Sequence, residues 1–220
     1  MSDIYIYDDI GPDWMGMVSS KTILSELEKV GRGKPVTVRI NSPGGDVIEA
    51  QAIYNALRRH SDAGGPVTIE IDALAASAAS FIAMAGDRIH IAENAMMMIH
   101  NAWTVALGNS DQLRSTADVL DKFDGIISAT YAKRSNADIQ DVVKMMADET
   151  WLTASEALDK GFADAVGQSL KIAAAAVKPG RFSRTPDRFI DRVDTSPEAN
   201  MDAGHRLSII KQKIRLTRVK

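Results

Sequence analysis

Short apolar runs alternate with longer segments in which apolar residues recur every three or four positions. Alternation of this kind predicts strands that alternate with amphipathic helices. The expected strands cover residues 4–7, 36–40, 67–71, 89–91, 96–99 and 162–166. The expected helices cover residues 19–30, 47–60, 77–85, 111–134 and 137–146, and a short one opens at Thr153 and closes at Gly161. This order predicts an α/β domain with largely parallel strands.

Two helix starts have recognisable capping residues. Asp46 stands just before the 47–60 helix, where its carboxylate can accept from unpaired backbone N–H groups. Thr153-Ala-Ser-Glu156 fits a capping box, in which the Thr and Glu side chains each bond the other's backbone N–H. Gly161 fits the end of the helix that this box opens.

The alternating pattern ends near residue 170. Residues 171–220 contain 12 Lys and Arg and 5 Asp and Glu, a charge of +7, which leaves −10 for the rest (14 minus 24). Prolines at 179, 186 and 197 interrupt any long element there. We therefore expect a domain at 1–170 and a basic, flexible appendage at 171–220, in which residues 207–214 fit a short amphipathic helix. The appendage is either a solvated tail or a docking arm for a partner or an acidic surface.

Composition excludes several classes of protein. The formal net charge of −3 gives no basic excess for nucleic acid, and the absence of cysteine rules out disulfides and thiolate metal sites. The acidic N-terminus lacks a signal-peptide pattern, and the most apolar window, residues 73–86, is too short to span a bilayer. We expect a cytoplasmic protein with no cofactor, no metal, no nucleic acid and no membrane partner.

A candidate nucleophile lies in the second of two small-residue segments, 41–46 and 73–78, each of which follows an apolar strand-like run and precedes a helix-like one. A third segment, the apolar run 96–101, carries a histidine at the end of another strand. Ser77 falls where a strand gives way to a helix, so its hydroxyl would be exposed and the Ala78 N–H would be free to bind an oxyanion. Ser80 competes with it but lies one turn into the helix, where its hydroxyl would bond a preceding carbonyl. Alternatively, this Ala and Ser run is only a close-packed helix face.

The other two segments supply an oxyanion donor and a base. Gly44-Gly45 either makes a simple sharp turn or lets a peptide approach the backbone, with the Gly45 N–H as a second oxyanion donor. Among the four histidines, His60 fits an exposed helix end, His205 lies in the tail, and His90 lies within a strand. His100 ends an apolar strand and is the candidate base, unless it is a structural histidine.

Four segments in this order resemble the proteolytic subunit of the Clp protease and, more closely, phage-type Clp-like head maturation proteases. They are Val38–Asp46, Ala75–Ser77, Met97–Asn101 and Glu149–Ala157 with Gly161–Asp164. The resemblance covers residues 3–168. It implies a serine endopeptidase without a cofactor, with catalytic Ser77, His100 and Glu149 and with oxyanion donors Gly45 and Ala78.

The resemblance also implies how a peptide would bind. An extended substrate would lie between the Gly44-Gly45 backbone and the segment at Ala102 and Trp103. The family's third catalytic residue is Asp, where this chain has Glu149, and Asp148 is the alternative acid.

The implied architecture is a ClpP/crotonase-like fold of repeated β-β-α units, whose protruding helix, here from about residue 111, joins subunits into rings. The resemblance implies a homo-oligomer that cleaves polypeptides, as a phage or prophage protease of capsid or scaffold proteins. Because the chain begins almost at its first strand, docking to an ATPase unfoldase is not expected.

Other functions remain open from the residues alone. A crotonase-type acyl-CoA enzyme would use the paired N–H groups for a thioester enolate, but it gives Ser77 and His100 no joint role. A catalytically silent ring subunit would keep these segments with a misaligned triad. A Ser/Lys peptidase would need Lys144 or Lys160 at the site.

Overall fold

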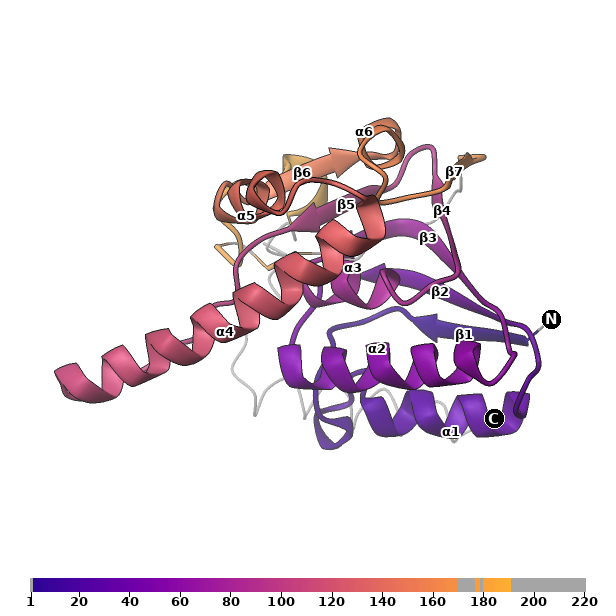
Figure 1. The fold of residues 1–220 in the computed structure, drawn as a ribbon, viewed down its shortest axis with the longest axis horizontal. Helices are drawn as coiled ribbons and strands as arrows, with labels where there is room; N and C mark the ends of the chain where they lie inside the picture. The colour runs from indigo at the N-terminus through magenta and orange to yellow at the C-terminus, as the bar shows by residue number, and fades with distance from the viewer. Residues whose placement is uncertain (1, 170–176, 179, 191–220) are drawn as a thin grey trace, which may run out of the picture.

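The computed structural model describes residues 2–169, 177, 178 and 180–190 of the 220-residue chain (Figure 1). The strands are β1 (Ser2–Ile6), β2 (Val36–Ser42), β3 (Val67–Ala76), β4 (Arg88–Ala92), β5 (Met96–Ile99), β6 (Thr150–Thr153) and β7 (Ala165–Gly167). The helices are α1 (Ser20–Val30), α2 (Val47–Asp62), α3 (Ala78–Ala83), α4 (Ser110–Ser135), α5 (Ile139–Ala147) and α6 (Ala154–Asp159). Two 3₁₀ turns, η1 (Asp13–Met15) and η2 (Asp187–Phe189), complete the described elements.

The sheet forks at its longest strand, β3. Strands β1, β2, β3, β4 and β7 lie side by side in that order, and all neighbours are parallel. The first half of β3 pairs with β4, whereas Leu74, Ala75 and Ala76 pair with Met96, Met97 and Met98 of β5. Strand β6 then pairs antiparallel with β5. Because β3 and β5 are parallel neighbours, their carboxyl ends, which carry Ser77 and His100, lie together.

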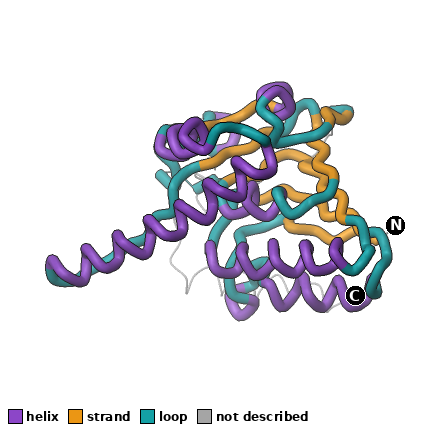
Figure 2. Tube along the Cα trace, viewed as in Figure 1, coloured by secondary structure: helices purple, strands orange, loops and turns teal. Residues whose placement is uncertain are grey.

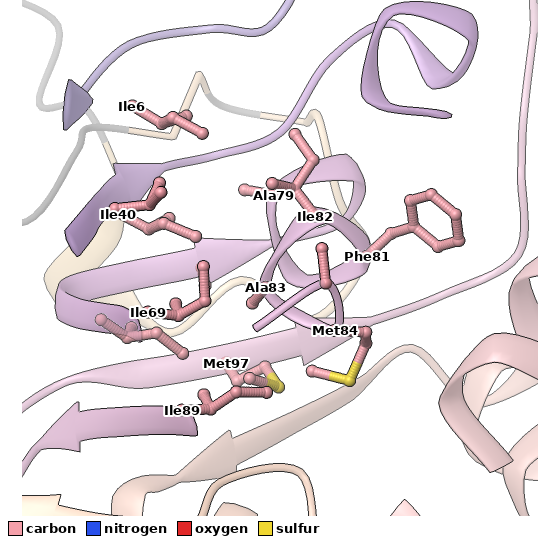
Figure 3. Close-up of a cluster of buried hydrophobic side chains, with 14 of the residues drawn as sticks. Ile6, Ile40, Ile69, Ala79, Phe81, Ile82, Ala83, Met84, Ile89 and Met97 are labelled. Atoms are coloured by element: carbon pink, nitrogen blue, oxygen red, sulfur yellow. The ribbon is translucent and has the colours of Figure 1, made fainter. Parts of the chain in front are cut away.

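The core lies between the sheet and a layer of helices. Helices α1, α2 and α3 cover one face of the sheet (Figures 1 and 2). In Figure 3, strand residues Ile6, Ile40 and Ile69 face Ile82 and its neighbours on α3. These side chains are fully buried, and their burial is the main stabilising contribution, at about 25 cal/mol per Å² of apolar surface. The small residues Ala79 and Ala83 let α3 pack close to the strands.

Helix α4 projects from the body of the molecule (Figure 1). Its buried residues are Ile127, Ser128 and Tyr131, all near its C-terminal end. The apolar Leu113 and Val119, nearer the N-terminal end, are 44% and 46% exposed. Within the described residues, no helix is long and apolar enough to cross a bilayer.

A second, smaller apolar cluster holds part of the C-terminal segment against the domain. Val177, Phe182 and Phe189 are buried with Leu74, Ala76, Met96 and Met98 from β3 and β5, and Trp151 of β6 packs against them. Val177 also pairs with Ile190, with its N–H donating to the Phe189 carbonyl oxygen at 2.7 Å. These residues belong to the stretch for which the sequence predicts a flexible appendage. Residues 171–176, 179 and 191–220 of that stretch, including the helix predicted at 207–214, lie outside the described residues.

The α/β alternation predicted from the sequence is confirmed, and so are both caps. The Asp46 carboxylate accepts from the N–H groups of Ile48 and Glu49 at 2.8 Å each, and Thr153 and Glu156 form the capping box. The strand predicted at 162–166 is wrong in its bounds, because Phe162 is instead a buried anchor between α6 and the short β7. Strand β6 was not predicted, because it is only four residues long and carries polar residues at both ends.

Candidate active site

Ser77 occupies a strained turn between β3 and α3. Its backbone has φ 55° and ψ −124°, a conformation that side-chain-bearing residues rarely adopt and that costs about 1–3 kcal/mol. The turn is held because the Ser77 N–H donates to the Met98 carbonyl oxygen of β5 at 2.9 Å. It aims the hydroxyl at His100, and 2.7 Å separates Ser77 Oγ from His100 Nε2. This distance is short enough for direct proton transfer.

The glycine pair lies against this turn. A Cβ on Gly44 would come within 2.5 Å of the Ala76 carbonyl oxygen and 2.8 Å of Ser77 Cβ, and a Cβ on Gly45 would come within 1.9 Å of the Ile10 carbonyl oxygen. Both glycines also have positive φ, 90° and 154°. Larger residues are therefore excluded at both positions for steric and conformational reasons.

Two backbone N–H groups face the same space. Ile10 bonds the carbonyl oxygen of Gly44 and the N–H of Asp46, so the N–H of Gly45, between them, points to the opposite side. The Ala78 N–H is in the first turn of α3, where no carbonyl of the helix can accept from it. Gly45, Ala78, Ser77 and His100 all line one pocket of about 470 Å³.

Ser80 is a structural residue, as its place in the helix predicts. Its hydroxyl lies 2.7 Å from the carbonyl oxygens of both Ser77 and Met98, and 2.8 Å from the Tyr131 hydroxyl. Ser80 and Tyr131 are fully buried. This network joins α3, β5 and α4 directly behind the Ser77 turn.

The other described histidines have structural partners. His60 was predicted as an exposed helix end, and this is wrong: it is 8% exposed, and its Nε2 contacts the Lys34 carbonyl oxygen at 2.8 Å. His60 therefore lies on the face of α2 that contacts the chain entering β2. His90 Nδ1 contacts Glu70 Oε1 at 2.9 Å on the neighbouring strand. Neither residue lines the Ser77 pocket.

The imidazole of His100 is largely enclosed. Burial is the main reason that its pKa falls to about 4; the nearby negative charge of Glu149 opposes this shift, and the positive charge of Arg181 adds to it. The ring of Phe182 meets the imidazole edge-on, with 5.1 Å between ring centroids. His100 is therefore neutral near pH 7, the state in which it can accept a proton from Ser77.

Glu149 directs its carboxylate to the C-terminal segment. Oε1 accepts from Trp151 Nε1 at 3.2 Å and from the Arg184 N–H at 2.6 Å, and Oε2 accepts from the N–H and the hydroxyl of Ser183, both at 2.6 Å. Burial alone would raise the pKa of this carboxyl, but these hydrogen bonds outweigh it and hold the pKa below its usual range. Among the described contacts, no hydrogen bond joins Glu149 to His100. Asp148 is exposed at the C-terminal end of α5.

Glu149 shares a positive φ with Ser77, but its place in the chain differs. Within the described residues, positive φ in a residue other than glycine occurs at Ser77, Asn136 and Glu149. Asn136 ends helix α4, a common place for such a residue. Glu149, with φ 49°, directly follows Asp148, the C-cap of α5, so its positive φ also falls just past a helix end.

The predicted substrate-binding residues border the pocket on the side of α4. Ala102 and Trp103 line it, and the Ala102 N–H donates to Asp124 of α4 at 2.6 Å. Trp103 is 59% exposed. Gly44, the third predicted substrate-binding residue, packs against the Ser77 turn and is not among the lining residues. The exposed Lys144 and Lys160 do not line the pocket either. In the part of the chain that the structure describes, no group of three or more metal-ligating side chains occurs.

The sequence did not indicate the contribution of residues 181–184. Arg181 and Phe182 line the pocket, and Ser183 and Arg184 bond Glu149. The available signal was the recurrence of an Arg-Phe pair at 181–182 and at 188–189, since aromatic residues are unusual in a basic, proline-interrupted stretch.

A serine in a strained strand-to-helix turn, in contact with a buried neutral histidine, is the arrangement that serine hydrolases use. Comparison with known proteins narrows this class. The Clp protease family model matches residues 2–170. This chain belongs to the Clp protease family, and it is a serine-type peptidase.

Individual relatives agree with the family match. The ATP-dependent Clp protease proteolytic subunit of Ligilactobacillus salivarius is 30% identical over 170 residues, which is 76% of this chain and 84% of that protein. Subunit 1 of Protochlamydia amoebophila is 31% identical over 150 residues, 66% of this chain and 71% of that protein. A mutant ClpP1 from Listeria monocytogenes shares the fold, with a TM-score of 0.66 at 19% identity over 76% of this chain and 91% of that chain.

The buried imidazole leads to a prediction about pH. Folding lowers the pKa of His100 to about 4 from the ordinary value of 6.5. Between pH 4 and pH 6.5, His100 is therefore mostly protonated in the unfolded chain and mostly neutral in the folded chain. Folding stability should therefore decrease as pH falls from about 6.5 to about 4. Urea unfolding at several pH values, with His100→Gln as the comparison, measures this, since the variant lacks that part of the pH dependence. Histidine-selective NMR should show the His100 ring titrating well below pH 6; titration near 6.5 would contradict the effect of burial.

Proposed function

We propose that this peptidase cleaves polypeptides with Ser77 as nucleophile, His100 as general base and Glu149 as the acid that supports the imidazolium. The observation that supports this most directly is the 2.7 Å contact between Ser77 Oγ and His100 Nε2 in a pocket that also receives two backbone N–H groups. A catalytically silent subunit would be expected to have a misaligned serine and histidine.

The first step would be acylation of the enzyme. Ser77 Oγ attacks the carbonyl carbon of the scissile peptide bond while its proton passes to His100 Nε2. The N–H groups of Gly45 and Ala78 stabilise the resulting oxyanion. The C–N bond then breaks, and the leaving amine takes the proton from His100.

The second step would be hydrolysis of the acyl-enzyme. Water enters as the amine leaves, gives a proton to His100, and attacks the ester carbon. When the intermediate collapses, Ser77 Oγ leaves and recovers that proton. The carboxylate of Glu149 would stabilise the positive charge on the imidazole in both steps.

The peptide would enter as an extended strand. Ala102, Trp103 and Gly45 line the pocket, Gly44 directly precedes Gly45, and Asp124 fixes the position of Ala102. Main-chain contacts of this kind give broad side-chain tolerance.

We also propose that the chain assembles into rings through α4. This helix projects from the body and leaves Leu113, Val119 and Ile126 between 44% and 50% exposed. Exposed apolar side chains along one helix fit a protein interface. Analytical ultracentrifugation of the purified chain should show a large oligomer, and Val119→Asp should reduce it to smaller species. A wild-type monomer at micromolar concentration would contradict the proposal.

A phage or prophage role in processing capsid or scaffold proteins is the more specific proposal. It is supported by the resemblance of Glu149–Ala157 to phage-type Clp-like head proteases. Incubation of the purified chain with a scaffold protein from the same genome, beside an unrelated folded protein, tests it. Equal cleavage of both would argue against a capsid-specific role.

The first mutational prediction concerns the serine and histidine. Ser77→Ala and His100→Ala should each reduce kcat by a factor on the order of 10⁴–10⁶, and the double variant should be little worse, because the two residues act as a unit. A fluorophosphonate, whose phosphorus is attacked by an activated serine as fluoride leaves, should give a single adduct on Ser77 by intact-mass spectrometry. Multiplicative losses in the double variant, or an adduct on Ser80, would overturn the assignment.

The second mutational prediction concerns the acid. Glu149→Gln should reduce kcat by roughly 10²–10⁴ while the oligomer stays intact, because the amide cannot stabilise the imidazolium. Asp148→Asn is the matched control, and its effect should be less than about threefold, since Asp148 is exposed at the end of α5. The opposite ranking would move the acid to Asp148.

A further inference from the structure

The C-terminal segment at residues 180–190, here called the strap, is fastened beside the catalytic groups at three points. Arg181 forms an ion pair with Asp9, and both side chains are mostly buried. Phe182 packs between His100 and Trp151, with ring centroids at 5.1 Å and 6.0 Å. Phe189 stacks on the indole of Trp151 at 5.8 Å.

The strap saturates the carboxylate of Glu149. An ionised carboxylate has about four lone-pair positions. Two of the donors on Glu149 come from Ser183 and one from Arg184, and Trp151, against which the strap packs, supplies the fourth. Each oxygen of the carboxylate therefore accepts two hydrogen bonds, which leaves no position for the Nδ1–H of His100.

The other two contacts also weaken His100 as a base. Arg181 places a positive charge near an imidazole that must itself become positive during catalysis. Phe182 covers the ring with an apolar edge, which adds to its burial. The strap bonds the acid, brings a cation near the imidazole and adds to its desolvation, and each of these disfavours the imidazolium.

We propose that the strap is an autoinhibitory element that holds Glu149 in a resting position, and that its release from Ser183 and Arg184 lets Glu149 bond His100 and raises the rate of catalysis. This proposal rests on the proposed function, because it takes Glu149 as the catalytic acid. It accounts for why the acid is bound by the C-terminal segment and not by the base.

The test removes one of the two hydrogen bonds that Ser183 donates to Glu149. Ser183→Ala deletes the hydroxyl donor and leaves the backbone in place, and Ser183→Asp sets a second carboxylate against Glu149. The probe is a fluorophosphonate on the full-length chain, and the measured quantity is the second-order rate constant for labelling Ser77. We expect a rise of at least about threefold for Ser183→Ala, since hydrogen bonds to charged groups are the stronger ones, and a larger rise for Ser183→Asp.

Ser169→Ala is the matched control. Its hydroxyl also donates to a glutamate, Glu93, at 2.9 Å, but neither residue lines the pocket. The labelling rate of this variant should equal that of the wild type. A further comparison tests the route of the effect: in a Glu149→Gln background, Ser183→Ala should give no rise, because there is no acid to release.

The kcat and KM of peptide cleavage distinguish two effects of loosening the strap: release of Glu149 and opening of the substrate path. If the strap acts on the acid, Ser183→Ala raises kcat and leaves KM within about twofold. A change in KM alone would mean that the strap covers the substrate path, and would overturn the proposal.

The remaining outcomes distinguish failure of the autoinhibition proposal from failure of the proposed function. If Ser77 is labelled in the wild type and the labelling rate of Ser183→Ala is unchanged or slower, the autoinhibitory role of the strap is overturned and the proposed function stands. The strap would then stabilise Glu149 in its active position. Absence of any Ser77 adduct in the wild type and in every variant would overturn the proposed function, and the strap with it.

Discussion

The close approach of two backbone turns determines the geometry of the whole site. The Gly44-Gly45 turn lies so near the Ser77 turn that even a methyl group at Gly44 would come within 2.5 Å of the Ala76 carbonyl oxygen. Ile10 fixes the glycine turn from the other side by bonding Gly44 and Asp46. Because both turns are held by the sheet, the Gly45 and Ala78 N–H groups and the Ser77 hydroxyl are positioned before any substrate arrives. In the proposed mechanism, such preorganisation would make these two backbone dipoles effective in stabilising the oxyanion.

The fork in the sheet explains how the serine and the histidine meet. Strand β3 pairs first with β4 and then with β5, so residues 77 and 100 extend from the ends of adjacent parallel strands. The Met98 carbonyl oxygen accepts from the Ser77 N–H and also lies within hydrogen-bonding distance of Ser80, which ties the strained turn to the strand that carries His100. Tyr131 extends this network to α4, the projecting helix. The same few buried groups therefore support both the Ser77 turn and the C-terminal part of α4, which carries Tyr131.

The C-terminal segment connects the second apolar cluster to Glu149, the proposed catalytic acid. Phe182 and Phe189 are buried against Trp151, and this burial brings Ser183 and Arg184 to Glu149. The family match ends at residue 170, so these contacts come from a part of the chain outside the matched region. Hydrophobic anchoring and charge-assisted hydrogen bonds cooperate here, because the anchored aromatic rings reduce the entropy lost when the polar contacts form.

The sequence by itself determined the local features: the α/β alternation, the caps at Asp46 and Thr153, the bond from the Ser80 hydroxyl to a preceding carbonyl, and the order of the small-residue segments. These depend on residues within about one helical turn or one strand of each other. Only the tertiary structure decided that His60 is buried, that residues 150–153 form a strand, and that Glu149 is bound by residues 183 and 184. Those outcomes depend on contacts between distant parts of the chain, such as the 34 residues that separate Glu149 from Ser183. No local sequence pattern encodes such pairings. They depend on which apolar surfaces of the folded sheet remain uncovered, and therefore on which distant segments pack against them.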